Sequence, residues 1–192
     1  MRLRIAVAMP EKGGRPAIVV AEVQRALGKD GRRQWNFTIG LVERVKRQNI
    51  EGARDRVLEL AEASISMKPC VFVDAGTPQG VALWRSVRKD WTRRLHRPHA
   101  YERTRFETAM FAVFLEAYAD GRVKFLGDLD NRKELDRALV LYKGGGVSKV
   151  SDDLESEDEA LVVATCLALM WPSHGGDASR VESRDGSSDG VR

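Results

Sequence analysis

The sequence has few of the residues that hold disulfide frameworks or thiolate metal sites: it contains two cysteines and three histidines. Cys70 and Cys166 both lie in apolar runs, so we expect them to be small core residues rather than a disulfide framework. No apolar run approaches the roughly 20 residues that span a bilayer. The apolar stretch at the N-terminus is too short for a secretory signal. We therefore expect a cytoplasmic protein with no membrane partner.

Two widespread catalytic signatures are also missing. The chain has no G-x-x-x-x-G-K-[ST] sequence, which excludes a nucleotide-driven motor of the P-loop type, and no G-x-S-x-G sequence, the commonest hydrolase signature. Its apolar share of 43% is enough to bury a core and excludes wholesale disorder. Residues 173–192 contain five serines, four glycines and no aromatic residue. They predict a disordered tail that follows one domain over residues 1–172.

The order of apolar patterns predicts an α/β fold. Three β-branched segments at the start of the chain predict antiparallel strands, and a continuous apolar run at 70–73 is typical of a strand buried on both faces. Helical periodicity occupies most of the remainder. The predicted elements are strands at 3–9, 17–23 and 35–42, a helix at 50–61, a strand at 70–73, helices at 79–91 and 105–119, a strand at 122–126, and helices at 131–142 and 158–171. We expect a central mixed sheet, three antiparallel strands followed by parallel ones, flanked by helices.

Charge is distributed unevenly, although the net charge is only +4. Eight basic residues and two acids lie between Arg85 and Arg105, whereas six acids and no basic residue lie between Ser151 and Glu159. One segment suits a polyanion and the other suits a metal ion. Two solvated surface stretches explain the same composition, and composition alone favours that second interpretation.

Asp74 is the first candidate site residue. It follows a buried strand and precedes a glycine turn and a helix, which is where open α/β sheets bind ligands. The alternative is an aspartate that caps the next helix or its turn. The residues leave both interpretations open.

The acid-rich start of the last predicted helix is the second candidate. Acids are favourable at a helix N-terminus because of the helix dipole, and Asp158 can be the capping residue. Six acids exceed what capping requires, and their mutual repulsion is unfavourable unless cations offset it. Carboxylate oxygens are the ligands that Mg²⁺ prefers. The candidate metal-ligating residues among these six acids are Asp152, Asp153, Glu157, Asp158 and Glu159.

The order of these pieces is similar to that of a ribonuclease H-like fold, and the chain resembles the C-terminal nuclease domain of the phage terminase large subunit. Residues 71–76 (VFVDAG) look like that family's second acidic motif, an apolar strand that ends in Asp, a small residue and Gly. Residues 158–164 (DEALVVA) look like its third, an acid pair that opens an Ala- and Leu-rich helix. Residues 121–125, followed by Glu134-Leu135, fit the family's spacing. The resemblance covers roughly residues 1–171 and rests on the order of the motifs.

The resemblance implies a metal-dependent endonuclease that cuts duplex DNA during genome packaging. Two divalent ions, Mg²⁺ or Mn²⁺, about 4 Å apart, would activate water and stabilise the leaving oxygen. Asp74 would bridge both ions. The implied catalytic residues are Asp74, Asp158 and Glu159, and the implied metal ligands are Asp74, Asp158 and Asp153.

The resemblance also implies partners. The basic stretch would contact DNA phosphates, which gives position and salt-dependent affinity rather than sequence choice. The implied DNA-binding residues are Arg85, Arg88, Lys89, Arg93, Arg94 and Arg97. The packaging ATPase would be a separate polypeptide or lie upstream, and a phage-encoded protein would act in the host cytoplasm with other packaging proteins.

The sequence departs from the family at the first strand. The family's first strand ends in Asp, usually followed by Pro, whereas this chain has Met9 before Pro10. A thioether is a poor ligand for Mg²⁺, and Glu11 and Glu22 are the other acids near this strand. One alternative is therefore a catalytically degenerate module of the same fold that binds DNA or a packaging partner. Another is a ribonuclease H-like enzyme such as a junction resolvase, which prefers branched DNA.

Overall fold

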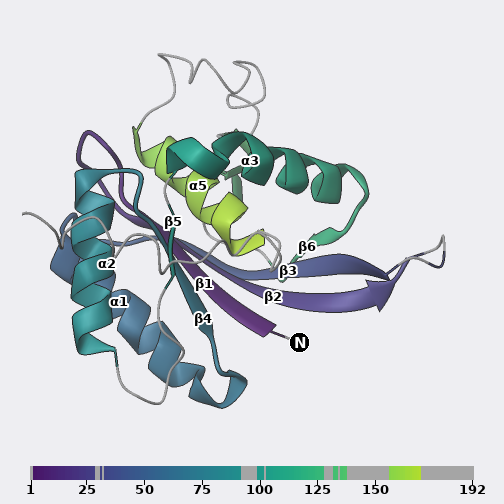
Figure 1. Cartoon of the computed structure of the whole chain (residues 1–192), viewed down its shortest axis with the longest axis horizontal. Coiled ribbons are helices and arrows are strands. Elements are labelled where there is room, and N and C mark those ends of the chain that lie inside the picture. The colour runs from purple at the N-terminus through teal and green to yellow at the C-terminus, as the bar shows by residue number, and fades with distance from the viewer. Residues whose placement is uncertain are drawn as a thin grey trace, which may run out of the picture.

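A mixed sheet forms the centre of the fold in the computed structural model (Figure 1), which describes residues 2–28, 31, 33–91, 99–101, 103–127, 132–133, 135–137 and 156–169. The six strands have the order β5-β4-β1-β2-β3-β6. Their bounds are β1 (Arg2–Ala8), β2 (Ala17–Leu27), β3 (Arg33–Arg44), β4 (Cys70–Asp74), β5 (His99–Tyr101) and β6 (Val123–Phe125). β2 is antiparallel to β1 and β3, whereas β4, β5 and β6 run parallel to the strands they join. The predicted α/β class and mixed sheet are confirmed.

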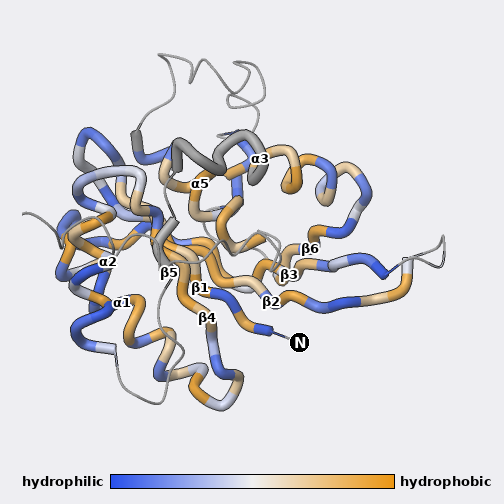
Figure 2. The backbone as a smooth tube through the Cα atoms, viewed as in Figure 1, coloured by the Kyte–Doolittle hydropathy of each residue, from blue (hydrophilic) through white to orange (hydrophobic). Residues whose placement is uncertain are grey.

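Helices cover both faces of this sheet. They are α1 (Ile50–Ala63), α2 (Pro78–Asp90), α3 (Arg103–Ala119) and α5 (Ser156–Leu169), with a short 3₁₀ turn at Ile65–Met67. α1 and α2 lie together on one face, and α3 and α5 on the other (Figure 1). Hydrophobic residues run along the central strands and α5, so the core has one layer on each side of the sheet (Figure 2).

β1 contributes side chains to both layers of the core because successive side chains of a strand point to opposite faces. Ile5 and Val7 pack in the layer under α1 and α2. Ala6 and Ala8 pack in the layer under α5. All four are fully buried, so β1 is a central strand that contributes to the core on both faces of the sheet.

The turn from β4 into α2 is set by local chemistry. Thr77 caps α2, since its Oγ1 accepts a hydrogen bond from the Gly80 N–H at 3.0 Å, and Pro78 occupies the first turn, where no backbone donor is needed. Only glycine fits at position 80, because a Cβ there would lie 1.9 Å from the carbonyl oxygen of Asp74. The start of α2 therefore packs directly on the backbone of Asp74.

Several elements differ from their predicted bounds. β2 and β3 are longer than the apolar patterns at 17–23 and 35–42, because their ends carry polar residues outside the core. β5 was not predicted, since its three residues carry no periodicity. Of the predicted helix at 131–142, residues 132–133 and 135–137 are described and helical. The predicted tail at 173–192 lies outside the described residues.

Other expectations concern burial. Cys166 is buried and Cys70 half-buried, both as free thiols packed in or against the core, as predicted. α5 is buried along its length, also as predicted. No helix in the described part of the chain is long and apolar enough to cross a membrane.

Candidate functional site

Asp74 ends β4 and is almost completely buried, with 1% of its surface exposed. It lies two residues after Phe72, which packs in the α5 layer, so strand alternation directs Asp74 to the same face. Its Oδ1 accepts a hydrogen bond from the Gly76 N–H at 3.0 Å. The turn-forming role that the sequence left open for Asp74 is therefore present in the structure.

A row of four neighbouring residues, one from each of four strands, crosses the sheet from Asp74 to Arg44. The register pairs Val7 with Val73, which sets Ala8 beside Asp74 one residue further on. Ala8 in turn pairs with Ala17, and Ala17 with Arg44. Both alanines pack in the α5 layer. The row thus has a carboxylate at one end, a guanidinium at the other, and two small side chains between them over which α5 packs.

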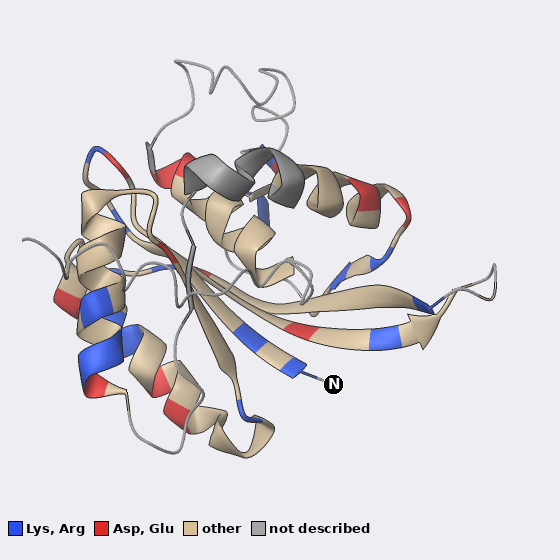
Figure 3. Ribbon diagram, in the orientation of Figure 1, with Lys and Arg blue, Asp and Glu red and all other residues tan. Residues whose placement is uncertain are grey.

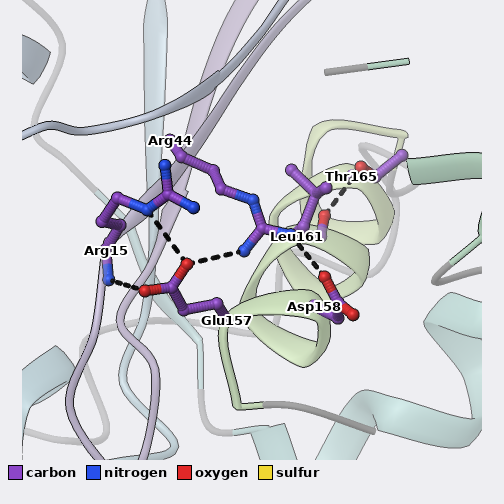
Figure 4. Close-up of polar contacts among 6 residues, drawn as sticks. All are labelled: Arg15, Arg44, Glu157, Asp158, Leu161 and Thr165. Atoms are coloured by element: carbon purple, nitrogen blue, oxygen red, sulfur yellow. Dashed lines mark hydrogen bonds and ion pairs between the residues drawn. The ribbon is translucent and has the colours of Figure 1, made fainter. Parts of the chain in front are cut away.

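The Arg44 side chain binds the first acids of α5 (Figure 4). Its Nη2 forms a charged hydrogen bond with Asp158 Oδ1, and its Nη1 bonds Glu157 Oε2 at 3.1 Å. Arg15 contacts Glu157 from the loop between β1 and β2: its backbone N–H donates to Oε1 at 2.8 Å and its Nε to Oε2 at 3.1 Å. The Arg44 side chain is only 5% exposed. Guanidinium groups therefore neutralise this acid pair, Asp158 in a buried contact and Glu157 in a partly exposed one.

Glu157 is held in its charged form. Burial by itself would raise its pKa, but the hydrogen bonds from the Arg15 backbone and side chain and the charges of Arg15 and Arg44 outweigh burial and hold the pKa below its ordinary value. Gly14 permits these contacts. Its φ of +122° lies in the left-handed region, and a Cβ there would lie 2.7 Å from Glu157 Cγ.

The lowered pKa of Glu157 predicts an acid-sensitive fold. A carboxyl group with a depressed pKa adds stability above its unfolded pKa of about 4.3, and this stability is lost as the pH falls through the folded value. Urea unfolding at a series of pH values should show this decline. Glu157→Gln should lower stability at neutral pH and flatten the decline below about pH 4. Parallel curves for the two proteins would contradict the assignment.

Arg4 anchors the opposite end of α5. Its guanidinium is buried, lies 5.5 Å from the centre of the Phe72 ring, and donates from Nη1 to the carbonyl oxygen of Ala168 at 3.2 Å. The last carbonyls of a helix lack partners within the helix and favour a cation. Within α5, the buried Thr165 hydroxyl donates to the Leu161 carbonyl at 2.8 Å (Figure 4). An arginine from the sheet therefore binds each end of this helix.

Three of the predicted site residues, Asp74, Asp158 and Glu159, are described and buried. Asp158 and Glu159 are both buried in the first turn of α5, and α5 packs against β4, which Asp74 ends. Asp153 lies outside the described residues. Among the described residues, no group of three or more histidine, cysteine, aspartate or glutamate side chains is arranged to hold a metal ion.

The expected position of the missing first acid is corrected by one residue. Met9 packs with Val7, Val73 and Leu83 in the layer under α1 and α2, on the opposite face from α5. Ala8, and not Met9, is the β1 residue beside Asp74 on the α5 face.

Neither alternative acid supplies this position. Glu22 pairs with Leu3 at the other end of β1, about 16 Å along the strand from Ala8 at 3.3 Å per residue. Glu11 lies exposed in the loop after β1.

The described residues do not fit a two-metal site. β1 offers the methyl group of Ala8 where the resemblance implies a carboxylate, and Asp158 is already paired with Arg44. A guanidinium at this position supplies positive charge and repels a divalent ion. Of the implied metal ligands, Asp158 is therefore the partner of an arginine in this fold.

The predicted DNA-binding residues divide into two groups. Arg85, Arg88 and Lys89 are exposed on α2, a helix with basic segments that are blue in Figure 3, and α2 packs on the face opposite α5. Arg88 lies over the Trp84 ring, 5.4 Å from its centre. At 1.5 Å per residue, Lys89 is about 16 Å along the axis from the start of α2, so these residues do not line the acid pair. Arg93, Arg94 and Arg97 lie outside the described residues.

Sequence reasoning missed Arg15 and Arg44. Arg44 could have been identified from the sequence, because it lies two residues after Val42 and therefore on the same face of its strand. A charged residue on a buried face needs a partner. Arg15 carried no such signal, because its role depends on how the loop meets α5.

Comparison with protein-family models, curated proteins and solved structures finds no match for this chain. The fold and the arginine–carboxylate network are therefore the basis of the functional conclusion.

Proposed function

We propose that the chain is a ribonuclease H-like domain of the terminase-nuclease type that binds duplex DNA without cutting it. The observation that carries this proposal is Arg44, whose guanidinium binds Asp158, a carboxylate that the metal-dependent enzyme would need as a ligand, together with the neighbouring Glu157. The parallel pairing of β1 with β4 supports the assignment, since the resemblance implies that these two strands are neighbours. The proposal corresponds to the degenerate alternative that the sequence left open.

Duplex DNA is the proposed ligand because the chain has exposed basic residues that can contact DNA phosphates and have no role in the proposed catalytic chemistry. Arg85, Arg88 and Lys89 are exposed on α2, and the net charge of the chain is +4. Such contacts release counterions from DNA, so affinity should fall steeply as the salt concentration rises. Binding that does not change with salt would contradict this electrostatic basis.

A metal-dependent nuclease is the second candidate. The observation that favours it is that Asp74, Asp158 and Glu159 are all buried, Asp74 at the end of β4 and the other two in the first turn of α5, a helix that packs against β4. For this candidate to hold, Arg44 has to leave Asp158 before the carboxylates can take a cation. The first candidate requires no such rearrangement.

Incubation with supercoiled plasmid in Mg²⁺ or Mn²⁺ separates the candidates. The control is Asp74→Asn, which keeps an oxygen that can accept from the Gly76 N–H. We expect both proteins to retard the plasmid in a gel without metal-dependent nicking. Nicking by the wild type that requires metal and is lost in Asp74→Asn would establish the nuclease. Absence of DNA binding by the wild type would overturn both candidates.

A further inference from the structure

The end of the β2–β3 hairpin extends beyond the rest of the sheet (Figure 1). β1 starts its pairing with β2 at Val23, and β6 starts its pairing with β3 at Phe37. Residues 24–27 of β2 and 33–36 of β3 therefore pair only with each other among the described strands. We refer to these two segments as the arm. A two-stranded ribbon is only marginally stable by itself. We therefore look for a binding role for this projecting arm.

The two faces of the arm differ in chemistry. One face carries Arg25 opposite Trp35 and Leu27 opposite Arg33. The Arg25 guanidinium lies 5.8 Å from the centre of the Trp35 ring. The other face carries three amides and one methyl group, on Gln24, Ala26, Gln34 and Asn36. Alternation from Val23 and Phe37, both in the α5 layer, places the arginine face on the α5 side of the sheet.

Exposure and charge show what kind of surface this is. Leu27 is 73% exposed, which is unusual for a large apolar side chain at the end of a strand, and Arg25 and Arg33 are exposed beside it. The arm contains no acid, and the whole stretch 24–36 has four basic residues against one acid. A basic ribbon with a row of amides suits a polyanion whose bases offer hydrogen-bonding edges.

We propose that the arm enters the major groove of duplex DNA. This inference rests on the proposed function for the identity of the ligand, and adds the surface that binds it. A two-stranded ribbon fits the major groove, which is about 12 Å wide. Arg25 and Arg33 contact the phosphates on either side, and the amide face reaches base edges.

The test measures fluorescence anisotropy of a labelled short duplex with the full chain over a salt series. Arg25→Gln/Arg33→Gln should raise the Kd on the order of tenfold and reduce the slope of log K against log salt by about two. The matched control is Arg54→Gln/Arg56→Gln, which removes the same charge from α1, where both arginines pair with acids. We expect the control to bind close to wild-type affinity.

The outcomes separate the two proposals. If the wild type does not bind the duplex, the proposed function fails and the inference falls with it. If the wild type binds and the arm variant matches the control, the inference is overturned while the proposed function stands. If the arm variant loses affinity for a single-stranded probe but keeps its affinity for the duplex, the inference is also overturned. Thermal unfolding should show no shift of the arm variant's midpoint from that of the wild type, because the substituted residues are exposed.

Discussion

Arg44→Met should lower the free energy of unfolding by about 3–5 kcal/mol, the cost of removing one partner from a buried ion pair. The Arg44 side chain is 5% exposed and the Asp158 side chain 11%, so water cannot replace the lost guanidinium. Glu157 would keep Arg15, but Asp158 would lose the charged hydrogen bond from Nη2. Methionine keeps length and apolar volume, so the loss reports on charge rather than on a cavity. Urea unfolding at neutral pH gives the value.

A matched substitution distinguishes this effect from a general loss of arginine. Arg56 also binds a carboxylate, through two nitrogens, but its side chain is 30% exposed, so Arg56→Met should cost about 1 kcal/mol or less. Adding Asp158→Asn to Arg44→Met should recover part of the loss, because the buried charge is then removed with its partner. If Arg44→Met costs no more than Arg56→Met, the acid pair does not depend on Arg44.

Gly80→Ala should produce the second large loss, about 3 kcal/mol. The added methyl group would lie 1.9 Å from the carbonyl oxygen of Asp74 and 3.0 Å from its carbonyl carbon. Both are backbone atoms, so relief requires the start of α2 to move away from the end of β4. The same movement would disturb the turn that Asp74 closes with Gly76. Alanine is otherwise the better helix former, so destabilisation here isolates the steric contact.

Gly40→Ala is the control for this substitution. Gly40 is exposed in β3, and the nearest atom to a Cβ there is Leu126 Cδ1 at 3.8 Å, an ordinary contact. The control should change the free energy of unfolding by less than about 0.5 kcal/mol. Equal stability of Gly80→Ala and the wild type would show that α2 does not pack on Asp74 as closely as described.

The parts of the fold that follow from local pattern could be predicted from the sequence. The β-branched runs give the first three strands, the apolar run that ends at Asp74 gives β4, and the continuous hydrophobicity of α5 gives its burial. Each of these depends on residues within one element. Elements with little local pattern were missed or cut short, such as the three-residue β5 and the polar ends of β2 and β3.

The position beside Asp74 shows a different limit. A one-residue change of register moves a side chain to the other face of a sheet. Motif spacing assigned the missing acid to Met9, but the pairing of Val7 with Val73 sets Ala8 there and sends Met9 to the other layer. Sequence spacing alone does not fix pairing between strands that are far apart in the chain.

The arginine network could not be predicted for a related reason. Arg44 and Asp158 are 114 residues apart, and Arg15 and Glu157 are 142 apart. The acid-rich start of α5 indicated that positive charge was needed, and a metal ion and a guanidinium satisfy that need equally well on composition. Only the packing of α5 over β1 and β2 brings the arginines to the acids.

The most direct test of the account is an experimental structure of the chain crystallised in MnCl₂, with anomalous scattering measured for manganese. We predict that Arg44 keeps its ion pair with Asp158 and that no anomalous peak lies between Asp74 and Asp158. A manganese ion bound by these two carboxylates, with the Arg44 guanidinium displaced, would contradict the account and establish a metal site.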